Sequence, residues 1–256
     1  MLVDTHVHLC DPCYDDDRSA VLDRAEAAGV GAVVAVGETI ADARRNLELA
    51  AEDPRVHPAA GLFPTRLDPD EATEIEELLR QHRDRFVAIG EVGLDHFKTR
   101  DHDQRAIQRD LFVRAIDLAL ELDLPLNVHS RATGKVTIDT LIERGARRVQ
   151  LHAFDGKHSH ALRAVEAGYF FSVPASIVRS QQKRKLVSKL PLDCLLVETD
   201  SPVLAPDRES RNEPANAVLS LREIAAIKEV NVEEVRERVI DNTRRLYGER
   251  VSSAGS

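Results

Sequence analysis

The 256-residue chain contains no tryptophan, and aromatic residues make up only 4% of its composition. An extended platform for stacking nucleobases needs aromatic side chains, so the composition argues against one. The chain also has only three cysteines. An odd, small number of cysteines in a chain of this length argues against a disulfide framework and is typical of a reducing compartment.

Long apolar runs and an excess of basic residues are also missing. No run approaches the roughly 20 residues of a membrane span, and no secretory signal opens the sequence, so we expect a cytoplasmic protein with no membrane partner. Lys and Arg number 35 and Asp and Glu number 44, which gives a formal charge of −9. This balance argues against tight nonspecific binding to duplex DNA. It does not argue against a phosphate-bearing substrate, because two bound divalent cations would add about +4 locally.

Short apolar runs alternate with longer amphipathic stretches along the whole chain. The eight runs expected to be strands are 2–8, 32–37, 56–62, 86–91, 125–129, 148–152, 169–173 and 194–199. The helical patterns between and after them are 18–28, 40–51, 71–81, 103–122, 137–144, 160–167, 181–190, 216–229 and 232–247. Apolar strands separated by helices are typical of a parallel sheet covered on both faces. We predict an α/β protein with a single TIM-like (β/α)8 barrel domain over residues 1–250 and a short flexible tail over 251–256.

Six side chains that could bind metal ions lie at the ends of five of these runs: His6, His8, Glu91, His129, His152 and Asp200. The catalytic groups of a (β/α)8 barrel come from the carboxyl ends of several strands, so we expect all six at one mouth. Alternate residues of a strand point the same way, which turns His6 and His8 into the barrel together. Asp4 shares this parity and is expected to hold one of the imidazoles.

The residue types indicate both the cofactor and the reaction. Four imidazoles and two carboxylates suit Zn, Mn, Fe or Co better than an all-oxygen Mg or Ca site. The two oxygens of Glu91 can bridge cations about 3.5–4 Å apart. Asp200 is the candidate general base, since a carboxylate beside a metal-activated water can bind the metal and take the proton. The sequence therefore predicts a hydrolase with two divalent metal ions, chosen from Zn, Mn, Fe, Co or Mg.

At these positions the chain resembles the TatD-type metal-dependent DNases of the amidohydrolase superfamily. The resemblance covers nearly the whole chain and is carried by the motifs at 4–8, 90–95, 129–131, 152–156, 198–202 and 211–214. It implies a TIM barrel in which Glu91 bridges two metals, one held by His6, His8 and Asp200 and the other by His129 and His152. It also implies phosphodiester hydrolysis, typically by an exonuclease that works from the 3′ end of single-stranded DNA. Nucleic acid is thus the expected partner, as substrate, and no obligatory protein partner is evident.

One departure from the family pattern follows the third apolar run. The family commonly has Gly-x-His-Pro there, whereas this chain reads Gly61-Leu62-Phe63-Pro64. Phe63 cannot donate a hydrogen bond to a phosphate, but it could stack on a base or line the mouth. The departure keeps a second function open, a metal-dependent deacylase or esterase acting on an acylated substrate such as aminoacyl-tRNA. A metal-binding scaffold with a degenerate site is the third alternative, and the complete set of ligands argues against it.

Cationic side chains after the later strands are expected to surround the same mouth. Together with Phe63, the predicted substrate contacts are Arg131, Lys157 and Arg211, with arginine acting as a two-pronged donor to phosphate. Arg179 is a weaker candidate of the same kind. The basic run 181–185 is interpreted as the exposed face of a helix, and His57 as an ordinary surface residue.

Overall fold

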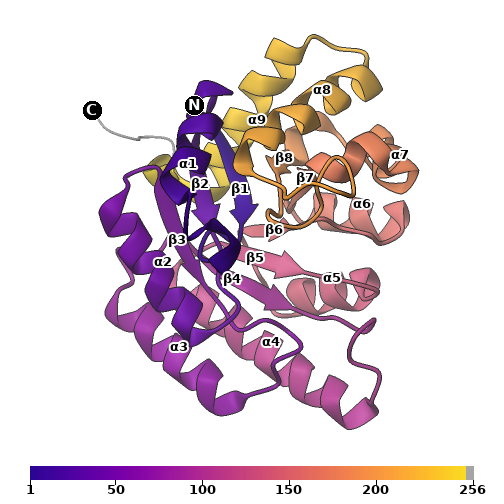
Figure 1. The fold of residues 1–256 in the computed structure, drawn as a ribbon. Coiled ribbons are helices and arrows are strands. Elements are labelled where there is room, and N and C mark those ends of the chain that lie inside the picture. The colour runs from indigo at the N-terminus through magenta and orange to yellow at the C-terminus, as the bar shows by residue number, and fades with distance from the viewer. Residues whose placement is uncertain (252–256) are drawn as a thin grey trace.

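The computed structural model describes residues 1–251, in which eight parallel strands form one barrel (Figure 1). The strands are β1 (Leu2–Val7), β2 (Val30–Ala35), β3 (Val56–Ala60), β4 (Ala88–Gly93), β5 (Leu126–His129), β6 (Val149–Leu151), β7 (Phe170–Pro174) and β8 (Leu195–Glu198). They lie side by side in the order of the sequence. The ring closes where the amide of His8 donates to the carbonyl of Ser201 and that of Asp200 to the carbonyl of His6, both at 2.9 Å. The predicted (β/α)8 fold is confirmed.

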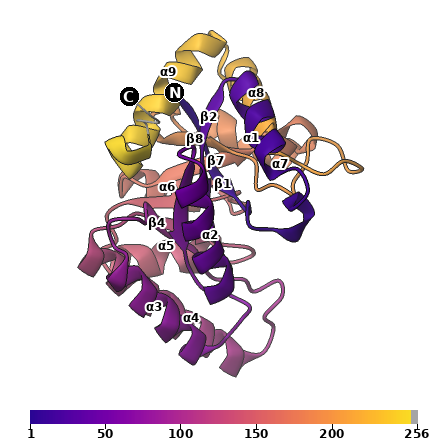
Figure 2. The same ribbon diagram turned by 60° about the vertical axis from the view of Figure 1, so that its left-hand side comes forward.

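Helices connect successive strands and cover the outside of the barrel (Figures 1 and 2). They are α1 (Arg18–Ala27), α2 (Ile40–Glu52), α3 (Pro69–Gln81), α4 (His102–Leu122), α5 (Gly134–Glu143), α6 (His158–Glu166), α7 (Gln181–Lys189), α8 (Ala217–Lys228) and α9 (Val232–Tyr247). Short 3-10 helices span Pro12–Tyr14, Ala175–Arg179, Leu192–Cys194, Pro214–Asn216 and Glu249–Val251. None of the helices in residues 1–251 is long and apolar enough to cross a membrane.

The ends of the helices follow from local capping. The carboxylate of Asp68 accepts hydrogen bonds from the amides of Asp70 and Glu71, both at 3.0 Å, so α3 begins at Pro69, before the expected residue 71. Gly29, Gly145 and Gly168 follow α1, α5 and α6 with φ of 92°, 70° and 82°. This left-handed backbone suits glycine and ends a helix before the next strand.

Part of the barrel interior is polar, where a (β/α)8 barrel usually holds layers of branched aliphatic residues. Asn127 and Gln150 are fully buried, and each donates a hydrogen bond to the carbonyl of Thr5, at 2.9 and 3.2 Å. The hydroxyl of Tyr247, at the end of α9, donates to Gln150 at 2.5 Å. The last helix thus anchors a buried polar network that extends through Asn127 to His6 of β1.

The predicted tail lies almost wholly outside the described residues. Val251 belongs to the last 3-10 helix and is buried. Residues 252–256 lie beyond the part of the chain that the structure describes. The division into a barrel over 1–250 and a tail over 251–256 therefore stays a prediction.

Candidate active site

The six predicted metal ligands lie together at the carboxyl end of the barrel. Five strands carry them: His6 and His8 at β1, Glu91 in β4, His129 at the end of β5, His152 directly after β6, and Asp200 two residues after β8. Asp200 has a left-handed backbone with φ of 56°. Aspartate adopts this conformation more readily than most residues, and such backbone is common at functional sites.

The first group of ligands consists of His6, His8 and Asp200. The Nε2 atoms of His6 and His8 lie 3.4 Å apart, and each is 3.4 Å from Oδ1 of Asp200. Oε2 of Glu91 lies 3.7 Å from the first nitrogen and 3.5 Å from the second. Two nitrogens and two carboxylate oxygens therefore face one small volume that could hold a cation.

The second group consists of His129 and His152, which face the other oxygen of the same glutamate. Oε1 of Glu91 lies 2.7 Å from Nδ1 of His129 and 2.8 Å from Nε2 of His152. These two ring nitrogens are 3.2 Å apart. The two oxygens of Glu91 thus face different histidine pairs, which is the arrangement expected of a carboxylate that bridges two metal ions.

The outer hydrogen bonds of two histidines place their free nitrogens toward these groups. Asn127 uses its amide N–H on the carbonyl of Thr5, so its Oδ1 accepts from Nδ1 of His6 at 2.8 Å. Oδ2 of Asp95 accepts from Nε2 of His129 at 3.2 Å. The lone pairs that remain are on Nε2 of His6 and Nδ1 of His129, the atoms that face Glu91. The donor set therefore fits a pair of divalent metal ions.

When no cation is bound, the pKa shifts at the site favour ionised Glu91 and Asp200 and protonated His8, His129 and His152. Burial alone raises the pKa of Glu91, but the charge of His152 and the hydrogen bond from His129 outweigh it and lower that pKa well below its usual value. Asp200 behaves similarly, because the bonds from His6 and His8 outweigh burial. Burial would lower the pKa of His8, yet Asp200 and Glu91 raise it to about 9. A bound cation would take the place of these protons, so metal affinity should depend on pH.

Asp4 does not hold an imidazole as the sequence suggested. Its Oδ1 accepts from the amide of Thr199 at 2.9 Å and that of His6 at 3.3 Å, and its Oδ2 accepts from the Thr199 hydroxyl at 2.5 Å. The carboxylate is directed at the backbone just before Asp200, because β1 and the end of β8 close the barrel here. Asp4 thereby positions Asp200 through Thr199.

Sequence reasoning also missed Glu38 beside the first group. Its Oε1 lies 3.9 Å from Nδ1 of His8, and the side chain is 44% exposed. Burial raises the pKa of Glu38, although His8 lowers it in part. With His8 and Glu91 it forms a further set of atoms that could contact a cation. Its position directly after the second apolar run was the signal that could have found it.

A pocket of about 260 Å³ opens beside the metal-ligand groups. Its lining includes His129, His152, Asp200, Arg131, Asp155 and Lys183. The guanidinium of Arg131 lies over the ring of Phe97, 4.1 Å from its centroid. Nζ of Lys183 donates to the carbonyl of Ala153 at 3.2 Å, and burial lowers its pKa. The sequence placed Lys183 on an exposed helix face, whereas α7 turns this residue toward the barrel mouth.

The other predicted substrate contacts lie elsewhere. Lys157 lines a separate pocket between α6 and α7. Arg211 forms a two-pronged ion pair with Asp17, at 2.9 and 2.7 Å, and lies 4.7 Å from the ring of Tyr14. Nε of Arg179 donates to the carbonyl of Ala205 at 3.0 Å. Of the arginine and lysine side chains predicted to contact substrate, only Arg131 is among the described residues that line the pocket beside the metal-ligand groups.

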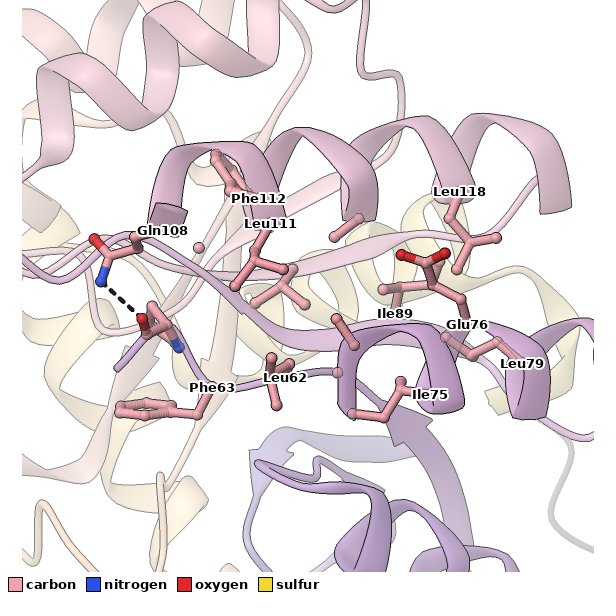
Figure 3. Close-up of a pocket in the computed structure, with 16 residues that line it drawn as sticks. Leu62, Phe63, Ile75, Glu76, Leu79, Ile89, Gln108, Leu111, Phe112 and Leu118 are labelled. Atoms are coloured by element: carbon pink, nitrogen blue, oxygen red, sulfur yellow. Dashed lines mark hydrogen bonds between the residues drawn. The ribbon is translucent and has the colours of Figure 1, made fainter. Parts of the chain in front are cut away.

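Phe63 lines one end of an apolar cavity (Figure 3) and also contacts a candidate metal ligand. Its ring meets that of His129 edge-on, with centroids 5.1 Å apart. The cavity, between α3, α4 and strands β3 and β4, has a volume of about 30 Å³, and Gln108 spans one end through a 2.8 Å bond to the carbonyl of Pro64. A space of this size holds only a water molecule or two. Phe63 therefore packs against a candidate ligand at the rim of a packing gap.

His57 differs from its expected surface position. It lies in β3, and its Nε2 is buried without a hydrogen-bond partner among the described residues. Burial lowers the pKa of His57 to about 4. The ring is therefore neutral in the folded protein at neutral pH.

Comparisons with known proteins agree with this geometry. A family model described as TatD related DNase matches residues 3–248. The chain is 45% identical over 262 residues to the human protein named Deoxyribonuclease TATDN3, covering 96% of this chain and 94% of that protein. It is 33% identical to the uncharacterized metal-dependent hydrolase YabD of Bacillus subtilis, covering 96% and 99%. The crystal structure of the TatD homolog YjjV from Escherichia coli superimposes with a TM-score of 0.90 at 30% identity, covering 96% and 97% of the two chains.

Proposed function

Since the chain belongs to the family of TatD-related DNases, we propose that it is a metal-dependent hydrolase that cuts phosphodiester bonds of DNA. The observation that carries the proposal is the position of Glu91. Its two oxygens face separate histidine pairs, at 2.7–2.8 Å on one side and 3.5–3.7 Å on the other. The name of the human relative supports the substrate, and that of the Bacillus subtilis relative supports the need for metal.

We assign the role of general base to Asp200. Two divalent cations, when bound, supply Lewis-acid stabilisation of the phosphate and lower the pKa of an attacking water. Glu91 is 1% exposed and does not line the pocket, whereas Asp200 is 7% exposed and does. In the metal-free protein His6 and His8 keep Asp200 ionised, and the Nε2 atom of each lies 3.4 Å from its Oδ1. Of the two carboxylates, Asp200 is thus the one that can reach the attacking water in the pocket and accept its proton.

The pocket and its rim favour a single strand as substrate. A volume of about 260 Å³ lies at the low end of ligand pockets and suits a strand end better than a duplex. At the rim, Phe97 is 50% exposed beneath Arg131, so one face of an aromatic ring and a cation are available to a base and its phosphate. The proposed direction, from the 3′ end, rests on the resemblance to the family.

A second candidate function is hydrolysis of an ester in an acylated substrate such as aminoacyl-tRNA. The observation that favours it is Phe63, which stands where the family commonly has histidine and packs against His129. An apolar ring at this rim offers no hydrogen bond to a phosphate, but it can contact an apolar acyl group. The same metal-ligand groups suit a carbonyl ester equally well.

The test uses a single-stranded DNA oligonucleotide labelled at its 5′ end, Mn²⁺ and a denaturing gel. We expect a ladder of labelled fragments that shorten with time, whereas cutting from the 5′ end would release a labelled mononucleotide at once. Asp200→Asn should give no ladder. Asp139→Asn, a matched change at a carboxylate paired with Lys135 and Arg163, should behave as the wild type. An intact band from metal-loaded protein would contradict the nuclease proposal and favour the ester.

A further inference from the structure

A second pocket adjoins the one beside the metal-ligand groups. It lies between the start of α6 and α7, has a volume of about 300 Å³, and is called the α6–α7 pocket here. Asp155 lines both pockets, so the two are neighbours on the side of the barrel mouth formed by the loop after β6. The α6–α7 pocket is also lined by Lys157, His158, Gln182 and Lys185. A strand held in the first pocket would therefore pass near the second.

The docking of α7 fixes the position of both pockets. Lys183 faces the metal-side pocket, while residues 182, 185 and 186, three and four positions apart, face the α6–α7 pocket. Two hydrogen bonds hold the helix against the loop after β6. Lys183 donates to the carbonyl of Ala153, and Gln182 donates to that of Asp155. The helix thus presents one lysine to each pocket from a single rigid element.

The lining of the α6–α7 pocket carries more positive than negative charge. Lys157 and Lys185 are exposed, and neither forms an ion pair with any residue of the described chain, in contrast to the neighbouring Arg184, which pairs with Glu223. Asp155 is the single carboxylate of the lining. The first residues of α6 also line the pocket, and the side chain of the N-cap Lys157 makes no capping bond. The positive end of the helix dipole therefore adds to the two lysines.

We propose that the α6–α7 pocket binds a backbone phosphate of the substrate strand other than the one that is cut. The proposal rests on the proposed function of the neighbouring site. In a protein with a net charge of −9, unpaired lysines beside the reaction centre would draw a polyanion to this path and away from the rest of the surface. The pocket would then set the preference for strands over short phosphodiesters.

The test compares a long and a short substrate on the Mn²⁺-loaded full chain. Decathymidylate can occupy both pockets, whereas bis(p-nitrophenyl) phosphate has one phosphodiester and reaches only the first. The variant carries Lys157→Gln and Lys185→Gln together. The control is Lys189→Gln, which removes one positive charge from the last turn of α7, outside the lining of either pocket, and is compared with each single variant, Lys157→Gln and Lys185→Gln, as well as with the double variant.

We expect the double variant to raise KM for decathymidylate by about tenfold or more, as for the loss of a charged hydrogen bond. The fall in kcat/KM for decathymidylate should be at least five times the fall for bis(p-nitrophenyl) phosphate. Lys189→Gln should match the wild type on both substrates. The slope of log affinity against log salt should fall by about 0.7, the value for one phosphate of a single strand. An equal fall in kcat/KM on both substrates, or an unchanged KM and salt slope for decathymidylate, would overturn the proposal.

Binding separates failure of this proposal from failure of the proposed function. Fluorescence anisotropy of 5′-labelled decathymidylate measures affinity without any turnover. If the wild type cuts neither substrate, the nuclease proposal fails. A tenfold weaker affinity in the double variant would then still support the phosphate site, and an equal affinity would overturn it.

Discussion

The hydrogen bond between Asp95 and His129 should determine the affinity of one metal site. Oδ1 of Asp95 accepts from the amide of Lys98 at 2.8 Å, and Oδ2 accepts from Nε2 of His129 at 3.2 Å. Burial raises the pKa of Asp95, but these bonds outweigh it and lower that pKa, so the group is ionised at neutral pH. A negative oxygen behind the imidazole makes the opposite nitrogen a better metal ligand.

Asp95→Asn keeps the shape of the side chain but cannot satisfy both donors. Whichever way the amide is turned, its NH2 group faces either the His129 ring N–H or the Lys98 amide. A buried donor left without an acceptor costs about 1–3 kcal/mol, of which a large part should appear as weaker metal binding. We therefore expect the affinity of the site formed by His129 and His152 to fall about 10- to 100-fold, the range for changes behind a metal ligand.

The assay is a calorimetric titration of the metal-free protein with Mn²⁺, which resolves two affinities when they differ. Only one of the two should weaken in Asp95→Asn, because His6 is held by Asn127 and not by Asp95. Asp139→Asn is the control at a carboxylate distant in the chain and paired with lysine and arginine. A change smaller than twofold, or an equal loss at both sites, would refute this reasoning.

Three further predictions concern the rim, the pocket and the stability of the fold. Phe97→Ala should weaken binding of single-stranded DNA by about 1–3 kcal/mol, the value for one stacked base, and an unchanged affinity by anisotropy would contradict this. Lys183→Gln should lower kcat/KM for an oligonucleotide about tenfold, while Arg184→Gln, whose guanidinium pairs with Glu223, should change it less than twofold. His57 has a folded pKa of about 4, below its unfolded value near 6.5, so the unfolded chain takes up its proton first as pH falls through this window. The wild type should therefore lose about 1–2 kcal/mol more unfolding free energy than His57→Gln between pH 7 and pH 5 in urea titrations; equal losses would contradict the burial of this ring.

The fold could be predicted from the sequence because its signals are local. Eight apolar runs separated by amphipathic stretches specify alternating strands and helices, and β8 at Leu195–Glu198 lies within the expected run 194–199. The positions of the candidate ligands follow from the same pattern. Polar residues at the ends of parallel strands must meet at one mouth, as His6 and Asp200 do across 194 positions of the chain.

What the sequence did not reveal depends on which way a side chain turns once distant elements pack. Lys183 lies in a run of charged and polar residues, so its composition favours solvent, but the docking of α7 on the β6–α6 loop turns it toward the mouth. Asn127 and Asp95 contact imidazoles that are 121 and 34 positions away. Asp4 was misassigned because strand parity gives the side of the sheet and not the neighbour that closes the barrel.

The central proposal is that Glu91 bridges two divalent ions, and metal content tests it most directly. The protein would be saturated with Mn²⁺, freed of excess ion by gel filtration, and analysed by plasma mass spectrometry together with Glu91→Ala. We predict two ions per wild-type chain and fewer than one per chain in Glu91→Ala, because both groups of ligands lose an oxygen. A wild-type chain that holds one ion or none, or a variant that retains two, would contradict the bridged pair.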